Sequence, residues 1–269
     1  MKMIKTAVVG AAGRMGRRFV VNICESNDLQ LSGALEIAEC PFIGQDAGLV
    51  AGIGETGVKI TNDYESVFAA SDAVINFSTQ GVVEATRIAV KYNCSVVIGT
   101  TALTDDDKAA LKEMADNGAR IVFAPNFSIG VNLLFYLSRK AADILGEDFD
   151  IEIVEMHHNQ KKDAPSGTAE RLGQILCEAR GLDYKTDVRH GREGICGART
   201  RKEIGMHAVR GGDVVGDHTV MFAANGERVE LTHKASSRDT FARGALTAVR
   251  FLADAKPGMY DMQDVLKLR

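Results

Sequence analysis

Short apolar runs and longer stretches of helical periodicity alternate through the first half of the chain. Apolar runs with the length of buried strands occupy residues 4–9, 29–35, 58–60, 73–77, 95–98 and 120–124. Helical patterns lie between them, as at 82–92 and at 105–115, where Thr104 is placed to cap the helix. Strands and helices that alternate at this spacing build a parallel sheet with helices on both faces. We therefore expect a doubly wound α/β unit.

The pattern changes in the second half of the chain. A helix is predicted over 131–145, and alternating apolar and acidic residues at 149–153 indicate a half-buried strand. A further helix has apolar positions through Ala179 and ends at Gly181. Three longer β segments follow, at 202–207, 217–223 and 227–233. This part of the chain predicts an α+β domain with an open mixed or antiparallel sheet.

An open sheet has a face and edges to cover, which indicates oligomerisation. The last helix, with apolar side chains from Phe241 to Leu252 along one side, is expected to return to the first domain and cover its sheet. The expected division is thus one domain from 1–129 plus 239–269 and a second from 130–238.

Composition narrows the class of protein. The chain has 269 residues, 45% of them hydrophobic, and a net charge of −4, which argues against a general nucleic-acid or membrane surface. No apolar run approaches membrane-spanning length, and the start resembles no signal peptide, so we expect a cytoplasmic protein. The five cysteines are scattered without CxxC spacing, which makes a disulfide framework or a zinc site unexpected.

A glycine-rich turn follows the first strand and opens a helix. Gly10 permits the tight turn, Gly13 lets the backbone approach a pyrophosphate, and Gly16 allows the helix to pack on the strand. Glu36 ends the second strand, where an acid holds a ribose hydroxyl pair. This combination predicts a Rossmann-type dinucleotide site.

The choice between NADH and NADPH stays open at this stage. Glu36 would repel a ribose phosphate and Ile37 supplies no cation for one, so NADH is at least as well suited. Arg14 and Arg17 remain able to serve a phosphate. Later strand ends carry small polar residues, at 77–79, 99–101 and 125–128, and are expected to line the nicotinamide half of the site.

The chain is organised around residues 155–169, a stretch with two adjacent histidines, two lysines and a Pro-Ser-Gly-Thr turn that opens a helix. We expect this stretch to form the loop between the strand and that helix. Backbone amides at a helix start favour negative charge, lysines add positive charge, and a histidine moves protons near neutral pH. The stretch predicts a site for an anion, with His157 and His158 as proton-handling groups and Lys161 and Lys162 as cations.

These motifs resemble those of the dihydrodipicolinate reductase family, and the resemblance extends over nearly the whole chain. It is carried by the stretch 155–169 and by the motifs at 8–16, 99–101, 125–132, 210–219 and 233–238. The resemblance implies NAD(P)H-dependent reduction of 4-hydroxy-tetrahydrodipicolinate, with loss of water, in diaminopimelate and lysine biosynthesis. It also implies a nicotinamide domain, a substrate and tetramerisation domain, NADH and/or NADPH as cofactor, and a homotetramer.

Site residues follow from the same resemblance. It implies that His157 is the proton donor and Lys161 its catalytic partner. The residues that it implies for the substrate are His158, Lys161, Ser166, Gly167 and Thr168. The residues that it implies for the cofactor are Gly10, Ala11, Ala12, Gly13, Arg14, Met15, Gly16, Glu36, Gly99, Thr100, Thr101, Pro125, Asn126 and Phe127. No metal is implied, since adjacent histidines on a strand point to opposite faces.

The chemistry of the residues agrees with this resemblance. A cyclic dicarboxylate needs cations and helix-start amides together, and hydride addition leaves an electron-rich enamine that must gain a proton from a group such as histidine. Two departures are present: Ile37 stands where NADPH-using relatives often have Arg, and Asn159-Gln160 replaces an Arg-His pair. Two alternatives stay open, a different two-domain nicotinamide dehydrogenase and a sensor that holds NADH without catalysis.

Overall fold

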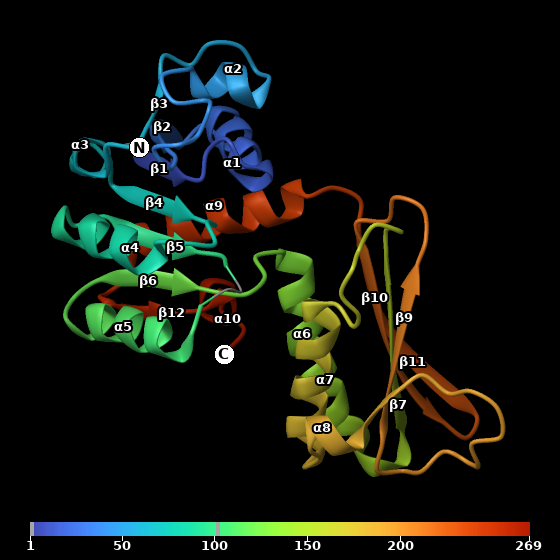
Figure 1. Ribbon diagram of the computed structural model, residues 1–269. Helices are drawn as coiled ribbons and strands as arrows, with labels where there is room; N and C mark the ends of the chain where they lie inside the picture. Colours follow the sequence, from blue (N-terminus) through green and yellow to red (C-terminus); the bar gives the residue numbers. More distant parts are fainter. Residues whose placement is uncertain (1–2, 101–102) are drawn as a thin grey trace. The chain divides into compact units, whose positions relative to one another are not determined.

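The computed structural model describes residues 3–100 and 103–269, and Thr101 therefore lies outside the described residues. The chain divides into two compact units, which are Met1–Ile129 with Arg238–Arg269, and Gly130–Ser237. Figure 1 shows the order of their elements along the chain. Over the described part, no helix combines the length and apolar character needed to cross a membrane.

The first unit is built on a seven-stranded sheet. Its strands are β1 (Ile4–Val9), β2 (Leu29–Leu35), β3 (Ile60–Thr61), β4 (Ala73–Asn76), β5 (Ser95–Ile98), β6 (Arg120–Phe123) and β12 (Gly258–Tyr260). They lie in the order β12-β6-β5-β4-β1-β2-β3, and every neighbouring pair is parallel. The order reverses between β1 and β4, which is the point where such sheets bind ligands at their carboxyl edge.

Helices cover both faces of this sheet, as the alternation of strands and helices predicted (Figure 1). On one face lie α1 (Arg14–Cys24), α2 (Ala47–Ala51), α9 (Asp239–Asp254) and α10 (Met262–Val265). On the other lie α3 (Tyr64–Ala69), α4 (Val82–Lys91) and α5 (Asp105–Asp116). Val8 points into the first core, whereas Ala7 and Val9 point into the second. The doubly wound fold is therefore confirmed.

Helix α9 packs against the first sheet from the far end of the sequence, as predicted. Ala245 and Val249 share a core with Phe19 of α1. A Cβ atom on Gly244 would come 1.7 Å from the carbonyl oxygen of Phe127, so only glycine permits this approach. The chain thus completes its first unit with its last long helix.

The second unit has a five-stranded sheet in the order β11-β10-β7-β9-β8. Its strands are β7 (Asp150–His157), β8 (Val188–His190), β9 (Ile204–Arg210), β10 (Gly216–Ala224) and β11 (Glu227–Ala235). The pairs β7–β9 and β8–β9 are parallel and the others antiparallel, so the expected mixed sheet is confirmed.

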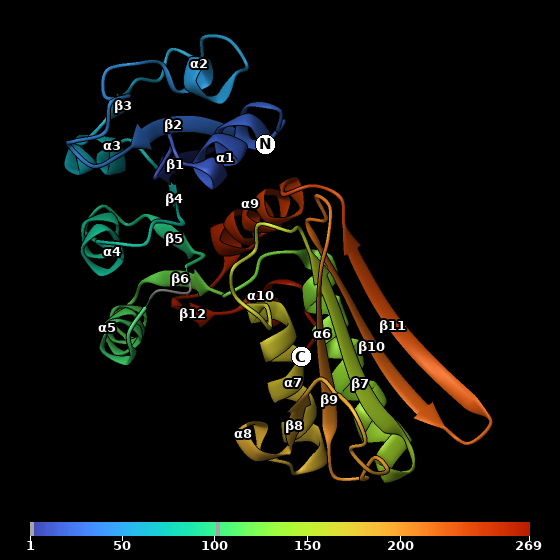
Figure 2. The ribbon, with the colours of Figure 1, turned by 45° about the vertical axis from the view of Figure 1, so that its right-hand side comes forward.

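One face of this second sheet is covered by helices (Figure 2). The helices are α6 (Ile129–Leu145) and α7 (Gly167–Arg180), with the short α8 (Tyr184–Asp187), and a 3-10 turn at Gly146–Asp148 precedes β7. Ile151 and Ile153 point into the core below them. Among the described residues no helix covers the opposite face, where Val154, Met156 and Met221 are only partly buried.

Several boundaries differ from the prediction, and two of them lie at β3 and β7. The strand expected at 58–60 is formed at Ile60–Thr61, and the stretch expected to be a loop from residue 155 still belongs to β7 as far as His157. Strand β7 continues because it has partners on both sides, Glu155 lying opposite His218 on β10 and Ala208 on β9. Ladder hydrogen bonds from both neighbours thus hold this polar segment extended.

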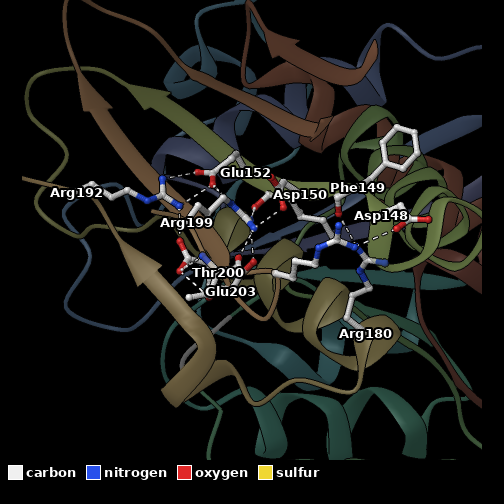
Figure 3. A network of polar contacts seen from close by, with 11 residues as sticks. Asp148, Phe149, Asp150, Glu152, Arg180, Arg192, Arg199, Thr200 and Glu203 are labelled. Carbon is white, nitrogen blue, oxygen red and sulfur yellow. Dashed lines mark hydrogen bonds and ion pairs between the residues drawn. The ribbon is translucent and has the colours of Figure 1, made fainter. Parts of the chain in front are cut away.

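An irregular segment between β8 and β9 is braced by a network of charges (Figure 3). Arg199 donates to Glu152 at 2.9 Å, to Asp150 at 2.8 Å, and to the carbonyl groups of Ile151 and Glu203. Arg192 bridges Glu152 and Glu203, at 2.7 Å each. Because each guanidinium has several partners in fixed directions, the segment is tied to the start of β7 without secondary structure of its own.

Candidate active site

The glycine turn between β1 and α1 has the geometry that a dinucleotide requires. Gly10 has a φ of 76°, in the left-handed region that favours glycine. A Cβ atom on Gly16 would lie 1.9 Å from the carbonyl oxygen of Gly10, so α1 could not approach the strand with any other residue there. Gly13 is the N-cap and has no side chain that could cap the helix, so the first amides of α1 are suited to bind an anion.

Glu36 lies beside this turn. Its Oε1 atom accepts a hydrogen bond from the amide of Ala12 at 2.9 Å, which brings the end of β2 and the glycine turn together. Arg17 donates from Nε to the carbonyl of Ala12 at 2.8 Å, and its guanidinium stacks 5.1 Å from the ring centre of Phe42. Ile37 is 60% exposed. The acid and the turn are thus arranged as in a site for the adenosine half of a dinucleotide.

The other predicted cofactor residues differ in what their side chains do. A Cβ on Gly99 would lie 2.1 Å from the ring of Phe77, so this position must stay bare at the end of β5. Thr100 is buried, and Asn126 accepts a hydrogen bond from the amide of Ser128 at 2.8 Å. Phe127 is 1% exposed and packs in the core, so only its backbone can face a ligand.

Pro125 is exposed beside it, and on the glycine turn Arg14 is exposed, Met15 partly buried and Ala11 buried. The residues from 10 to 16 therefore fit a dinucleotide through their backbone, with the helix start available to the pyrophosphate and Glu36 to a ribose. This donor set is suited to a nicotinamide cofactor.

In the second unit, β7 ends in two ionisable groups on its buried face. Glu155 is 0% exposed and His157 is 9% exposed. Arg210, at the end of β9, donates from Nη1 and Nη2 to the two carboxylate oxygens of Glu155, at 2.9 Å each. Burial raises the pKa of the Glu155 carboxyl, but hydrogen bonds from His157, Arg210 and the amide of Ser166 outweigh it and hold the pKa at about 2. Glu155 is therefore a buried, ionised carboxylate.

A second histidine lies beside the first. The ring of His218 on β10 stands edge to face with that of His157, with 5.2 Å between their centres. Burial, followed by the nearby His157, lowers the pKa of His218 to about 3, so its imidazole is neutral. Its Nε2 atom lies 3.0 Å from Oγ of Ser166, and that Oγ accepts a hydrogen bond from the amide of Ala169. His218 thus fixes the capping hydroxyl at the start of α7.

The loop between β7 and α7 holds the remaining predicted residues. The amide of His158 donates to the carbonyl of Val214 at 2.7 Å, and its side chain is partly exposed. The Nζ atom of Lys161 lies 2.8 Å from Oδ2 of Asp163, whereas Lys162 is exposed. Gly167 and Thr168 form the first turn of α7 and follow the capping Ser166 directly.

The structure brings most of the predicted second-unit site together, and it adds Glu155, Arg210 and His218. His157, Ser166 and the loop are linked by Glu155 and Arg210, for which the sequence predicted no role. The signal for Glu155 was present, because residues two apart on a strand share a face. The signal for Arg210 was absent, because it joins Glu155 across a parallel strand pair 55 residues further along the chain.

The first unit is doubly wound and carries a dinucleotide turn, and the second unit places a buried histidine beside an anion loop. Together these features define a nicotinamide-dependent oxidoreductase. Residues 4–127 match the family model described as dihydrodipicolinate reductase, N-terminus, and residues 130–266 match dihydrodipicolinate reductase, C-terminus. The chain belongs to the dihydrodipicolinate reductase family, as its motifs predicted.

Individual relatives agree with the family. The 4-hydroxy-tetrahydrodipicolinate reductase of Syntrophotalea carbinolica is 54% identical over 99% of this chain and 100% of its own length. That of Geotalea daltonii is 50% identical, with the same shares covered. A solved structure, dipicolinate-bound dihydrodipicolinate reductase from Paenisporosarcina sp. TG-14, is 26% identical, with a TM-score of 0.77 over 97% of this chain and 98% of that chain.

Proposed function

We propose that this protein reduces 4-hydroxy-tetrahydrodipicolinate to tetrahydrodipicolinate, with loss of water, in diaminopimelate and lysine biosynthesis. Relatives that bear the name of this reaction cover 99% of this chain with about half of the residues identical, 54% and 50% for the two above. The observation that carries the proposal is the buried His157, held by an ionised Glu155 at the entrance to a loop rich in cations and helix-start amides. A cyclic dicarboxylate that must gain a proton matches that chemistry.

The roles of the residues follow from their chemistry. When bound, a reduced nicotinamide supplies the hydride. His157 gives the proton that the reduced ring must gain, and Lys161 pairs with a substrate carboxylate. The amides of Gly167 and Thr168 with the hydroxyl of Ser166 form the second carboxylate site, at the start of α7. His158 is proposed as a further substrate contact from the same loop.

The cofactor residues are proposed on the same basis. Those from Gly10 to Gly16 with Glu36 hold the adenosine half, and Gly99, Thr100, Pro125, Asn126 and the backbone of Phe127 line the nicotinamide half. Thr101 is proposed with them from the family motif alone. NADH is used at least as well as NADPH, because Glu36 disfavours a ribose phosphate and the exposed Ile37 offers it no cation.

A homotetramer is proposed from the second sheet. Its helix-free face carries Val154, Met156 and Met221, and Val209 beside them is 42% exposed. Apolar side chains on an open sheet are stabilised by burial against another copy. Light scattering coupled to size exclusion tests the state, and a monomer at micromolar concentration would contradict it.

The reaction is tested by the loss of nicotinamide absorbance in a coupled assay. A synthase generates the substrate in the cuvette from pyruvate and aspartate semialdehyde, and NADH and NADPH are supplied in parallel. Oxidation that needs both the synthase product and this protein supports the proposal. If the protein binds NADH but oxidises neither cofactor when the synthase product is supplied, the proposal is contradicted. Another dehydrogenase substrate or an NADH sensor would then be favoured.

Two neighbouring lysines provide a matched pair of variants. Lys161→Ala is expected to lower kcat/KM by about 100-fold or more, because a carboxylate partner is lost, while NADH binding stays unchanged. Lys162→Ala, next to it and exposed, is expected to stay within about threefold of wild type. Equal losses in both variants would contradict the role given to Lys161.

A further inference from the structure

The two ring nitrogens of His157 lie in different surroundings. Its Nδ1 atom is 2.5 Å from Oε2 of Glu155, two residues earlier on β7. An ionised carboxylate accepts hydrogen bonds and donates none, so Nδ1 carries a hydrogen. The neutral ring is therefore held as the Nδ1–H tautomer, and Nε2 is the nitrogen that is free to gain and lose a proton.

The space beside Nε2 is kept open by a glycine. A Cβ atom on Gly216, at the start of β10, would lie 2.9 Å from Nε2 and 3.4 Å from Cδ2 of His157. The backbone of Gly216 is extended enough to accept a side chain, since its φ is not in the left-handed region, so conformation does not demand glycine there. The missing side chain instead leaves room at the nitrogen that exchanges the proton.

The groups that face His157 come from three strands and the loop. They are Glu155 on its own strand, Arg210 on β9, His218 on β10 and the amide of Ser166 bonded to Glu155. Since His218 is neutral, the formal charge that the described residues place in contact with the ring is the Glu155 carboxylate. Arg210 shares Oε2 of that carboxylate with His157, donates to Oε1 as well, and also donates to the carbonyl of Asp163 at 2.7 Å.

We propose that Glu155, held in place by Arg210, is the positioning residue that fixes the tautomer of His157 and makes Nε2 the atom that delivers the proton. The inference rests on the proposed function for the identity of the proton acceptor. The Nε2–H bond breaks as a C–H bond forms on the reduced ring, from the enamine electron pair. His157 is left neutral with Nδ1–H still bonded to Glu155, and a proton from solvent restores Nε2–H.

The substitution Glu155→Gln separates the tautomer from simple packing, because it keeps the size and removes the charge. The single amide oxygen then keeps the two donors that meet at Oε1, the amide of Ser166 and Nη2 of Arg210, which turns the amide NH2 group toward His157. Nδ1 must now accept that hydrogen bond, so the neutral ring changes to the Nε2–H tautomer. A loss of about 100- to 10,000-fold in kcat is expected, the range seen when a general acid or base is held in the wrong tautomer.

The experiment records the imidazole nitrogen resonances of protein labelled with 15N-histidine, and His157→Asn identifies the His157 signal by its loss. In wild-type protein the neutral ring is expected to show a protonated Nδ1 and an unprotonated Nε2. In Glu155→Gln the assignment reverses while the circular dichroism spectrum is retained. Glu152→Gln is the matched control, because Glu152 lies on the same strand but contacts His207 at 2.7 Å instead of His157.

The outcomes separate this inference from the proposed reaction. A wild-type His157 in the Nε2–H tautomer would overturn the inference even if Glu155→Gln fails to fold. A folded Glu155→Gln that keeps the Nδ1–H tautomer, or keeps kcat within threefold, would overturn it as well. If wild-type protein fails to reduce the synthase product, the proposed reaction falls, whereas the tautomer is still measured without any substrate.

Discussion

The Nζ atom of Lys161 lies 2.8 Å from the Oδ2 atom of Asp163, two residues along the same loop. The lysine proposed to bind a substrate carboxylate is thus already paired with a carboxylate of its own chain. The Lys161 side chain is 19% exposed and that of Asp163 is 65% exposed. Hydrogen bonding to Lys161 lowers the pKa of Asp163, so the aspartate is ionised at neutral pH.

Removal of this internal competitor is expected to strengthen substrate binding. Exposed ion pairs contribute about 0.2–1 kcal/mol, so Asp163→Asn is expected to lower KM for the dicarboxylate by roughly 1.4- to fivefold, with kcat within about twofold. Steady-state kinetics measures both constants. Asp105→Asn is the control, since Asp105 pairs with Lys108 at 2.9 Å on the surface of the first unit. A higher KM in Asp163→Asn would mean that the aspartate orients the lysine for the substrate.

The open space beside Nε2 of His157 leads to a second prediction. Gly216→Ala places a methyl group 2.9 Å from that nitrogen and is expected to lower kcat by at least about tenfold, because proton donors need an unobstructed approach. Gly211→Ala is the matched control, since its Cβ would meet only the flexible end of Met156, at 3.1 Å. Equal kcat values in the two variants would show that the proton does not pass through this space.

Cofactor preference is expected to change at Ile37. This side chain is 60% exposed and follows Glu36, so Ile37→Arg adds a cation where a ribose phosphate would lie. KM for NADPH is expected to fall by about tenfold, while KM for NADH changes by less than about twofold. Leu49→Arg, 55% exposed on α2, adds the same charge away from the predicted site. An equal effect of both variants would show that the change in KM for NADPH comes from net charge and not from the position of the arginine.

Stability is expected to fall in mild acid because of His218. The folded protein holds the pKa of His218 at about 3, against 6.5 for the free side chain, so below pH 6.5 the unfolded chain binds a proton that the folded one does not. Stability is therefore lost as pH falls from 6.5 toward 3, by about 1.4 kcal/mol per pH unit. His218→Gln is expected to lose about 2 kcal/mol less than wild type between pH 7 and 5.

Urea unfolding at fixed protein concentration measures this difference, with His190→Gln, at an exposed position, as the control. His218 and Glu155 are the two buried groups of this cluster with large pKa shifts, and of these two His218 is the one whose contribution to stability changes between pH 6.5 and 4.5. The Glu155 carboxyl has its pKa lowered from 4.5 to about 2, so its contribution is lost only below pH 4.5. Identical pH dependence of wild type and His218→Gln would contradict a neutral, buried His218.

Local sequence rules predicted the parts of the fold that depend on local pattern. β1 and β2 have their predicted bounds, and the predicted capping by Thr104 is present as a capping box with Asp107. Strand β12 was missed because three residues at a sheet edge carry too little periodicity to be recognised. The extension of β7 to His157 was missed because it depends on partners from β9 and β10, which are remote in sequence.

The residues of the candidate site divide in the same way, into local motifs that the sequence predicts and contacts between segments remote in sequence. The glycine turn, Glu36 and the start of α7 could be predicted because each is a local motif with a known backbone requirement. The surroundings of His157 could not, since Arg210 and His218 reach it only through the pairing of strands. Asp163 lies two residues from Lys161, so their pairing could have been predicted from the sequence. Whether Lys161 pairs with Asp163 or with a substrate carboxylate depends on geometry.

The second unit is an insertion within the first, because the chain leaves the first unit at Ile129 and returns at Arg238. On the ribosome, residues 1–129 emerge before α9 and β12 exist, so the apolar face that α1 and the sheet present to Ala245 and Val249 of α9 has no cover. The first unit cannot close until the whole insertion has been synthesised and the last helix has arrived. Nascent chains that stall within residues 130–238 are therefore expected to expose this face and to require chaperones, whereas the inserted unit can complete its own core first.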